Sequence, residues 1–258
     1  MKVVILCGGK GARLHQETEF RPKPMVEIGG KPILWHIMKI YSHYGFKEFI
    51  LCLGYKGDII RQYIANYNIM NYDCTVTLGA GPAQAIYKKD ISEDWKITLV
   101  NTGLESNTGL RLKMIKPFLN KKAFMVTYGD GLADINLSQL VQFHKTKKKT
   151  LTLTGVYPYE RYGIIEVNQK NMVNEFLEKP KTCNLVNAGF MVCEPEIFNY
   201  INGDVPFEKK PIYTLADKKE VACFKHSGFW HSMDTFRDFL YLNELWNSHK
   251  ASWKIWKE

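Results

Sequence analysis

Short apolar runs alternate with helix-like patterns through the first 150 residues of this 258-residue chain. Val3–Leu6 is a continuous apolar run that ends in glycines, as expected for a strand buried on both faces. Pro32 then opens a helical pattern that Gly45 ends. Further strands are predicted at residues 49–53, 97–100 and 124–127, and further helices near residues 58, 110–119 and 137–146. Such alternation predicts a mostly parallel sheet with helices on both faces.

The pattern changes after residue 150. Strand-like segments at residues 150–157, 163–167, 172–178 and 188–193 follow one another with little helix between them, before a final apolar helix. No internal repeat and no linker-like composition divides the chain. The sequence therefore predicts one α/β domain over residues 1–258, Rossmann-like, whose sheet is parallel in the first half and mixed in the second.

The net charge of +9 and the six cysteines narrow the class of protein. The lysines are spread along the chain and no nucleic-acid-binding motif is present, so we expect the excess charge to attract phosphorylated substrates and expect no nucleic-acid partner. No apolar stretch approaches the roughly 20 residues of a membrane span, and the N-terminal run lacks a signal-peptide pattern. The cysteines form no C-x-x-C pair and no zinc spacing, which predicts buried, reduced thiols in a cytoplasmic protein.

A glycine-rich loop, GGKGARL at residues 8–14, follows the first predicted strand. Glycines let the backbone approach a ligand closely, and consecutive N–H groups form an anion-binding concavity. Leu14 stands where a Rossmann fingerprint needs a third glycine, and Pro32 stands where a Walker A loop needs a hydroxyl. The loop therefore indicates a phosphate site of another type, although alone it also fits an ordinary tight turn.

Lys23 lies between two prolines, nine residues beyond the loop. Flanking prolines restrict the backbone, so they hold the ammonium group in a defined place. An exposed lysine in a proline-rich turn is the alternative. The closeness of Lys23 to the glycine loop and to Arg13 favours a contact with phosphate.

Two aspartates are the candidate metal ligands. Asp130 follows an apolar strand, at the carboxyl end where ligands of open α/β sheets bind. Asp234 comes much later, and Mg²⁺ is commonly held by one or two carboxylates together with substrate phosphates, so a pair distant in sequence is chemically sensible. The alternatives are a turn residue for Asp130 and a helix N-cap before Thr235 for Asp234. Lys179, held extended ahead of Pro180, is suited to contacting a second phosphate.

Together these motifs resemble those of the sugar-phosphate nucleotidyltransferases. The shared pattern, in order, is G-G-x-G-x-R-L, P-K-P-M, G-D, E-K-P, N-x-G-F and a late aspartate. Residues 27–38, 54–57, 127–131 and 228–235 resemble more narrowly the cytidylyltransferases that act on glucose 1-phosphate. The resemblance implies a glycosyltransferase-A-like fold, CTP and a sugar 1-phosphate as substrates, Mg²⁺ as cofactor and a homo-oligomer.

The resemblance also implies a role for each matching residue. It gives catalysis to Arg13, Lys23 and Lys179, and Mg²⁺ binding to Asp130 and Asp234. It gives nucleotide contacts to Leu6, Gly8, Gly9, Gly11, Ala12, Arg13, Lys23, Arg111 and Asp130. It gives acceptor contacts to Tyr128, Gly129, Glu178, Lys179, Asn187 and Gly189. Residues 1–150 would thus bind the nucleotide, and residues 151–258, with the C-terminal helix, the acceptor.

Two departures from the family pattern bear on the substrates. Ala12 replaces a common threonine near the nucleotide, and Lys210 stands where a second acid is usual. A reversal of charge at Lys210 would alter which acceptor is held. The open alternatives are the same chemistry with dTTP or UTP, CTP with a non-glucose acceptor, a nucleotide-binding regulator without turnover, and a nucleic-acid-binding protein. Leu14 disfavours an NAD(P)-dependent oxidoreductase.

Overall fold

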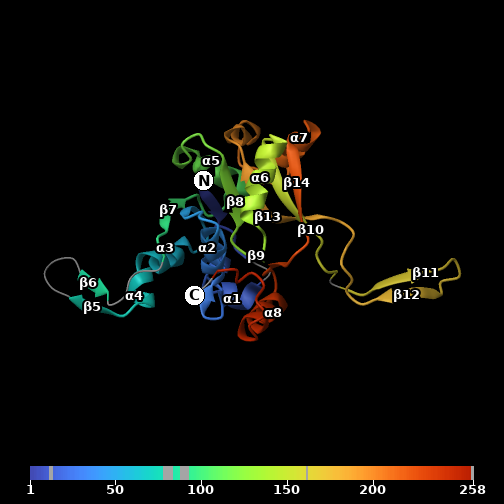
Figure 1. The fold of residues 1–258 in the computed structure, drawn as a ribbon, viewed down its shortest axis with the longest axis horizontal. Coiled ribbons are helices and arrows are strands. Elements are labelled where there is room, and N and C mark those ends of the chain that lie inside the picture. Colours follow the sequence, from blue (N-terminus) through green and yellow to red (C-terminus); the bar gives the residue numbers. More distant parts are fainter. Residues whose placement is uncertain (12–13, 78–83, 88–92, 161, 257–258) are drawn as a thin grey trace.

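A seven-stranded sheet forms the centre of the molecule, in the order β14–β10–β13–β8–β1–β4–β7 (Figure 1). The computed structural model describes residues 1–11, 14–77, 84–87, 93–160 and 162–256. Within this sheet β13 is antiparallel to both of its neighbours, and all other pairs are parallel. The predicted mixed, mostly parallel sheet is therefore confirmed. Its strands are β1 (Val3–Leu6), β4 (Glu48–Leu53), β7 (Lys96–Asn101), β8 (Phe124–Tyr128), β10 (Leu151–Val156), β13 (Val186–Cys193) and β14 (Val221–His226).

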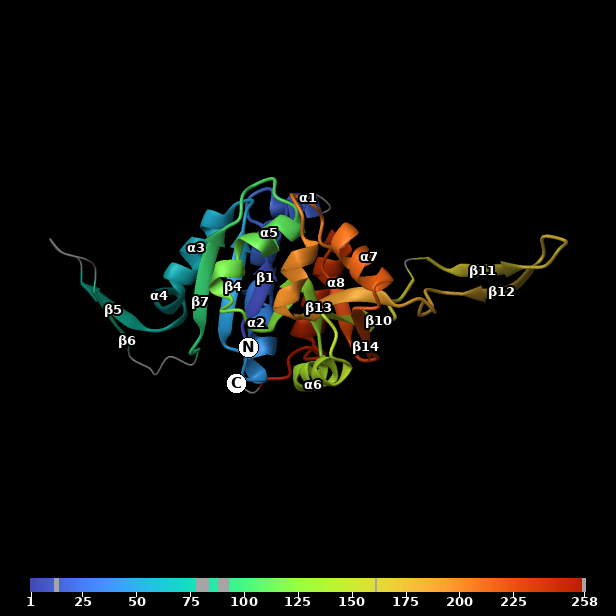
Figure 2. The same cartoon turned by 90° about the horizontal axis from the view of Figure 1, so that it is seen from above.

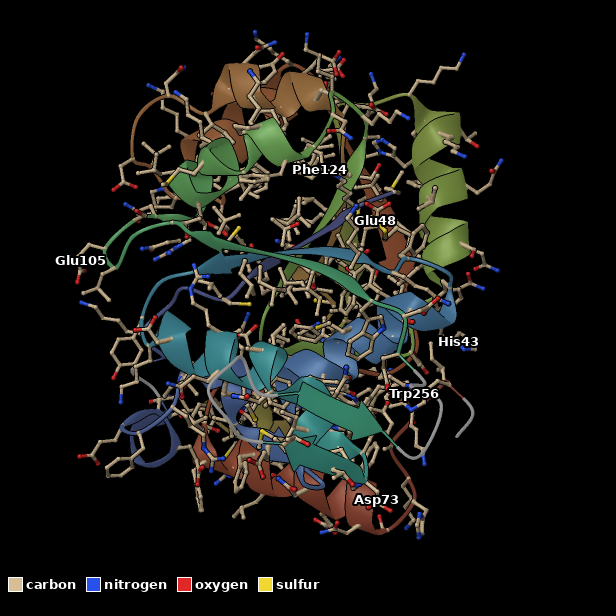
Figure 3. The ribbon with its side chains drawn as sticks, turned by 90° about the vertical axis from the view of Figure 1, so that its left-hand side faces the viewer. His43, Glu48, Asp73, Glu105, Phe124 and Trp256 are labelled. Carbon is tan, nitrogen blue, oxygen red and sulfur yellow. The ribbon has the colours of Figure 1, made fainter. Side chains whose placement is uncertain are left out.

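Helices cover both faces of the sheet, as predicted (Figure 3). Alternate residues of β1 explain why: Val3 and Ile5 belong to one buried cluster, and Val4 and Leu6 to the other. The first cluster takes in side chains from α2 (Ile33–His43), α3 (Gly57–Ala65), α6 (Leu137–Lys147) and α8 (Phe236–Asn247). The second takes in side chains from α5 (Thr108–Met114) and α7 (Lys210–Asp217). Phe124, labelled in Figure 3, stacks on Phe198 in the second cluster.

Two β-ribbons extend from the body in opposite directions (Figures 1 and 2). One pairs β11 (Ile164–Val167) with β12 (Val173–Leu177), and the other pairs β5 (Cys74–Thr77) with β6 (Gln84–Tyr87). The predicted strands at 163–167 and 172–178 do form, but their placement in the mixed sheet is wrong. The polar residues 168–171 close a tight hairpin, so each strand finds its partner locally, and every residue of both strands is exposed.

Shorter elements connect these parts. They are α1 (His15–Thr18), α4 (Tyr67–Asn71), β2 (Glu27–Ile28), β3 (Lys31–Pro32), β9 (Gly131–Ala133), β15 (Trp230–Ser232) and the 3₁₀ turns η2 (Lys23–Met25), η3 (Lys116–Phe118) and η4 (Pro195–Tyr200). In the part of the chain that the structure describes, no helix combines the length and apolar character needed to cross a membrane.

All six cysteines are free thiols. Cys7, Cys52 and Cys193 are buried in or next to strands of the sheet, as predicted. The prediction of burial is wrong for Cys183 and Cys223. Cys223 lies on β14, which is an edge strand of the sheet, and Cys183 lies in the loop between β12 and β13.

Candidate active site

A cavity of about 430 Å³ opens at the carboxyl edge of the parallel strands. It is bounded by the loop after β1, the η2 turn, the loop between β7 and α5, and the end of β8. Its lining residues are Leu6, Cys7, Gly8, Gly9, Gly11, Lys23, Pro24, Ser106, Asn107, Thr108, Arg111, Tyr128, Gly129, Asp130, Pro206 and Glu208. The predicted nucleotide-side residues that the structure describes therefore share one cavity, while the predicted Ala12 and Arg13 lie outside the described residues.

Lys23, in the wall of this cavity, forms ion pairs with both predicted metal ligands. Its Nζ lies 2.6 Å from Asp130 Oδ2 and 2.8 Å from Asp234 Oδ1. The lysine side chain is only 11% exposed, so the alternative of an exposed turn lysine is wrong. The prolines on either side of Lys23 are also buried and fix the turn from which it reaches inward.

A small ribbon brings the two aspartates together across the sequence. After β8 the chain turns at Asp130 into β9, which pairs antiparallel with β15. Met233 N donates to Asp130 O at 2.9 Å, which sets Asp234 beside Asp130. The N-cap alternative for Asp234 is wrong because Thr235 caps α8 and forms a capping box with Asp238.

The charges at this point favour a bound cation. Burial alone would lower the pKa of Lys23, but the charges and hydrogen bonds of Asp130 and Asp234 raise it above its ordinary value. One ammonium faces two carboxylates, so oxygens that can bind a cation converge on one point. Carboxylate oxygens suit Mg²⁺, although among the described residues no group of three or more His, Cys, Asp and Glu side chains could hold a metal. Substrate phosphates would have to complete the coordination.

Arg111 is buried behind the cavity and organises its loops. Its side chain is among the buried charged groups, at 4% exposure. It donates to four backbone carbonyls, those of Gly8 at 3.1 Å, Gly103 at 2.8 Å, Leu104 at 3.2 Å and Leu53 at 3.3 Å. A Cβ at Gly8 would lie 2.1 Å from Arg111 Nη1, so a side chain there would displace the guanidinium group. Arg111 thus ties together the loops after β1, β4 and β7, and its direct contact with a nucleotide stays a prediction.

Glu208 is a site residue that the sequence analysis missed. Tyr128 Oη donates to Glu208 Oε1 at 2.7 Å, and Thr108 Oγ1 donates to Glu208 Oε2 at 2.6 Å. Burial, and then the neighbouring Glu208, raises the pKa of Tyr128 above its ordinary value. The sequence gives Glu208 no role, because its contact with Tyr128 depends on a fold that brings it back to the end of β8.

Asn187 and Gly189 lie next to Tyr128, on β13. Asn187 Nδ2 donates to Tyr128 Oη at 3.5 Å, and Asn187 Oδ1 accepts from Gly189 N at 3.0 Å. Gly189 has a φ of +82°, and a Cβ there would lie 2.3 Å from the Tyr128 ring. The structure therefore brings these two predicted acceptor residues to the edge of the cavity through Tyr128.

Tyr128 and Gly129 line the cavity, but the last two predicted acceptor residues do not. Glu178 and Lys179 follow β12, are exposed, and pair with each other at 2.9 Å. Neither lines the cavity. Lys210, the departure from the family pattern, is an exposed residue in the first turn of α7 and does not line it either.

Comparison with known proteins shows a family match and close relatives. A family model described as "Nucleotidyl transferase" matches residues 2–248. The chain is 46% identical, over 100% of both chains, to the glucose-1-phosphate cytidylyltransferase of Salmonella typhi. It is 42% identical to the probable glucose-1-phosphate cytidylyltransferase of Bacillus subtilis, over 99% of this chain and 100% of the relative.

Solved structures share the fold. HddC from Yersinia pseudotuberculosis superposes with a TM-score of 0.69 at 23% identity, covering 95% of this chain and 99% of its own. A putative glucose-1-phosphate thymidylyltransferase from Bacillus anthracis superposes with a TM-score of 0.70 at 16% identity, covering 100% of this chain and 98% of its own. The predicted fold class is therefore confirmed.

Proposed function

We propose that this chain, which belongs to the nucleotidyl transferase family, joins CTP to a sugar 1-phosphate, giving a CDP-sugar and pyrophosphate. Glucose 1-phosphate is the acceptor we favour, because relatives that match the whole chain are named for it. The observation that carries the proposal is the meeting of Lys23, Asp130 and Asp234 beside a glycine-lined cavity at the sheet edge. This arrangement would offer one triphosphate an ammonium group, two carboxylates that could hold a metal ion, and backbone N–H groups.

The chemistry proposed is an in-line attack by the acceptor phosphate oxygen on the α-phosphorus of CTP. No protein nucleophile is needed, because positioning and neutralisation of charge lower the barrier. Gly8, Gly9 and Gly11 would hold the triphosphate through backbone N–H groups, and Lys23 would neutralise part of its charge. Asp130 and Asp234 would hold Mg²⁺, which when bound offsets charge on the phosphates.

The remaining assignments are proposed on the resemblance. Arg13 would neutralise triphosphate charge, and Lys179 would keep the acceptor phosphate close to the nucleotide. Asn187 and Gly189 would face the sugar, next to Tyr128 at the cavity edge. We also propose that the protein acts in the cytoplasm. Its six cysteines are free thiols, which suits a reducing compartment.

The test is pyrophosphate release with Mg²⁺, crossing CTP, UTP, dTTP, ATP and GTP against glucose 1-phosphate and other sugar 1-phosphates. We expect the fastest turnover with CTP and glucose 1-phosphate. Turnover with CTP and another acceptor would keep the mechanism and change the substrate. Nucleotide binding without turnover for any pair would contradict the proposal and favour a nucleotide-binding regulator.

We further propose that the chain works as a homo-oligomer whose contacts cover the β11–β12 ribbon. Ile165 and Phe176 pair across the ribbon and are 55% and 58% exposed, and the neighbouring pair of Ile164 and Leu177 is exposed on the opposite face. A two-stranded ribbon with apolar residues on both faces is marginal in water alone. On α8, the side chains of Phe236, Leu240 and Tyr241 are exposed, so a second copy offers an apolar surface.

Analytical ultracentrifugation tests this assembly. The wild-type chain should sediment as an oligomer and the Phe176→Asp variant as a smaller species. Phe118→Asp, which changes an exposed phenylalanine on the body of the molecule, is the matched control. An unchanged sedimentation coefficient for Phe176→Asp would contradict a role for the ribbon.

A further inference from the structure

The ammonium group of Lys23 lies between the two carboxylates that the proposed function assigns to the metal. It contacts one oxygen of each, at 2.6 Å and 2.8 Å. The lysine reaches this point from a buried turn and is 11% exposed. A positive charge therefore already fills the position that these two oxygens share.

Groups other than Lys23 hold the two aspartates in place. Met233 N donates to the main-chain oxygen of Asp130 at 2.9 Å. Ser232 Oγ donates to Asp234 Oδ2 at 3.1 Å, and Asp234 N donates to Asp238 Oδ2 at 3.0 Å. The main chain at Asp130 and the carboxylate of Asp234 therefore have contacts that do not depend on Lys23.

A divalent cation and the ammonium compete for these oxygens. Mg²⁺ binds its oxygen ligands at about 2.0–2.1 Å. A metal ion bound to both oxygens would therefore lie only a few Å from the Lys23 ammonium, and two positive charges that close repel each other strongly. A triphosphate changes the balance in two ways. It offers Lys23 new anionic partners, and it supplies oxygens that complete the metal coordination.

We infer that Lys23 is a displaceable counter-ion, which keeps the carboxylate pair closed to metal in the free protein and turns to the triphosphate when metal and nucleotide bind together. The inference rests on the proposed function, because the cation and the nucleotide are those of the same site. Its consequence is a positive coupling between metal and nucleotide, built from a single side chain. Free metal would then not accumulate in a site that lacks substrate.

The test measures binding of Mn²⁺ alone, by the electron paramagnetic resonance signal of the free ion, with no nucleotide present. We expect the Lys23→Met protein to bind one Mn²⁺ at least about tenfold more tightly than the wild type, because the competing charge is gone. Lys149→Met is the matched control. It removes a lysine that pairs with Glu220 at 3.4 Å, ahead of β10 at the opposite edge of the sheet, and should bind Mn²⁺ like the wild type.

Two results would overturn the inference. One is equal Mn²⁺ affinity in the wild type and in a folded Lys23→Met protein. The other needs no variant, since a wild-type protein that binds Mn²⁺ alone with a micromolar Kd has an open metal site. Lys23→Gln repeats the first comparison if the methionine variant does not fold, with circular dichroism as the check on folding.

The inference and the proposed function fail separately. Absence of turnover for every substrate pair would contradict the proposed function, and the Mn²⁺ comparison would still decide the role of Lys23. Equal Mn²⁺ affinities with normal turnover would contradict the inference and leave the proposed function intact.

Discussion

The two sides of the candidate site are built in different ways. On the nucleotide side, Gly8, Lys23 and Asp130 lie on turns anchored to buried strands, and Arg111 bonds the surrounding loops to one another. On the acceptor side, Lys179 follows a ribbon in which every strand residue is exposed.

This difference separates two structural requirements. The nucleotide-side residues are positioned by the fold of one chain, because they lie on loops and turns next to the same buried sheet. The acceptor side has only its inner half, Tyr128 with Asn187 and Gly189, fixed in that way. We therefore expect changes on the two sides to affect different kinetic constants.

The largest effect is expected from Asp130→Asn. The amide keeps the shape of the side chain and removes the charge that faces Lys23 and the proposed metal. Pyrophosphate release should fall by about 100- to 1,000-fold. Glu220→Gln, a carboxylate paired with Lys149 at the opposite edge of the sheet, is the matched control and should leave turnover unchanged. Near-normal activity of Asp130→Asn would mean that Asp130 has no role in catalysis.

A smaller effect, confined to the acceptor, is expected from Lys179→Met. Loss of one charge on the acceptor phosphate should reduce kcat/KM for the sugar 1-phosphate by about 100-fold and leave the KM for CTP unchanged. Lys181→Met, two residues away with its ammonium over the Tyr159 ring, is the control. A raised KM for CTP would show that Lys179 also affects nucleotide binding. It would contradict the view that the two sides of the site control different kinetic constants.

Gly189→Ala tests the rigid inner half of the acceptor side. The new Cβ would meet the Tyr128 ring at 2.3 Å, and the φ of +82° strains any residue with a side chain. The free energy of unfolding should fall by roughly 1–3 kcal/mol, measured by urea denaturation. Gly203→Ala separates the two causes, because its φ is +76° but nothing lies within 4 Å of its Cβ. Equal losses in both variants would mean that backbone strain, and not the Tyr128 contact, decides the effect.

The contrast between the buried sheet and the exposed ribbon also explains how much of the fold could be predicted from sequence. Val3–Leu6 is apolar throughout because both of its faces are buried, so it is recognisable as a central strand. Residues 164–167 and 173–177 have apolar residues in a strand-like pattern, but nothing in the pattern says what covers them. Their local pairing was therefore not predicted.

The site was predictable to the extent that local motifs carry it. The glycine loop, Lys23 and Asp130 each stand in a short motif, and the structure brings them together. Glu208 could not be found in this way, because its partner Tyr128 is 80 residues away in sequence. Nor does sequence give distances, so the bridging of both aspartates by one ammonium could only be seen in the structure.

The smallest predicted effect is a change in the free energy of unfolding at acid pH, caused by Asp238 near the start of α8. Burial would raise the pKa of Asp238, but hydrogen bonds from His231 and Thr235 outweigh it and lower the pKa from 3.8 to about 2. Because the folded-state pKa is depressed, this carboxylate stabilises the fold above about pH 4, and the contribution is lost as the pH falls from there toward 2.

Asp238→Asn has no such titration, so the difference in unfolding free energy between wild type and variant should narrow as the pH falls from about 4 toward 2, as measured by urea denaturation. A difference that stays constant with pH would mean that Asp238 stabilises the start of α8 by geometry alone. Because Asp238 accepts a hydrogen bond from Asp234 N, a narrowing difference would tie the protonation of a capping residue to the support of a proposed metal ligand.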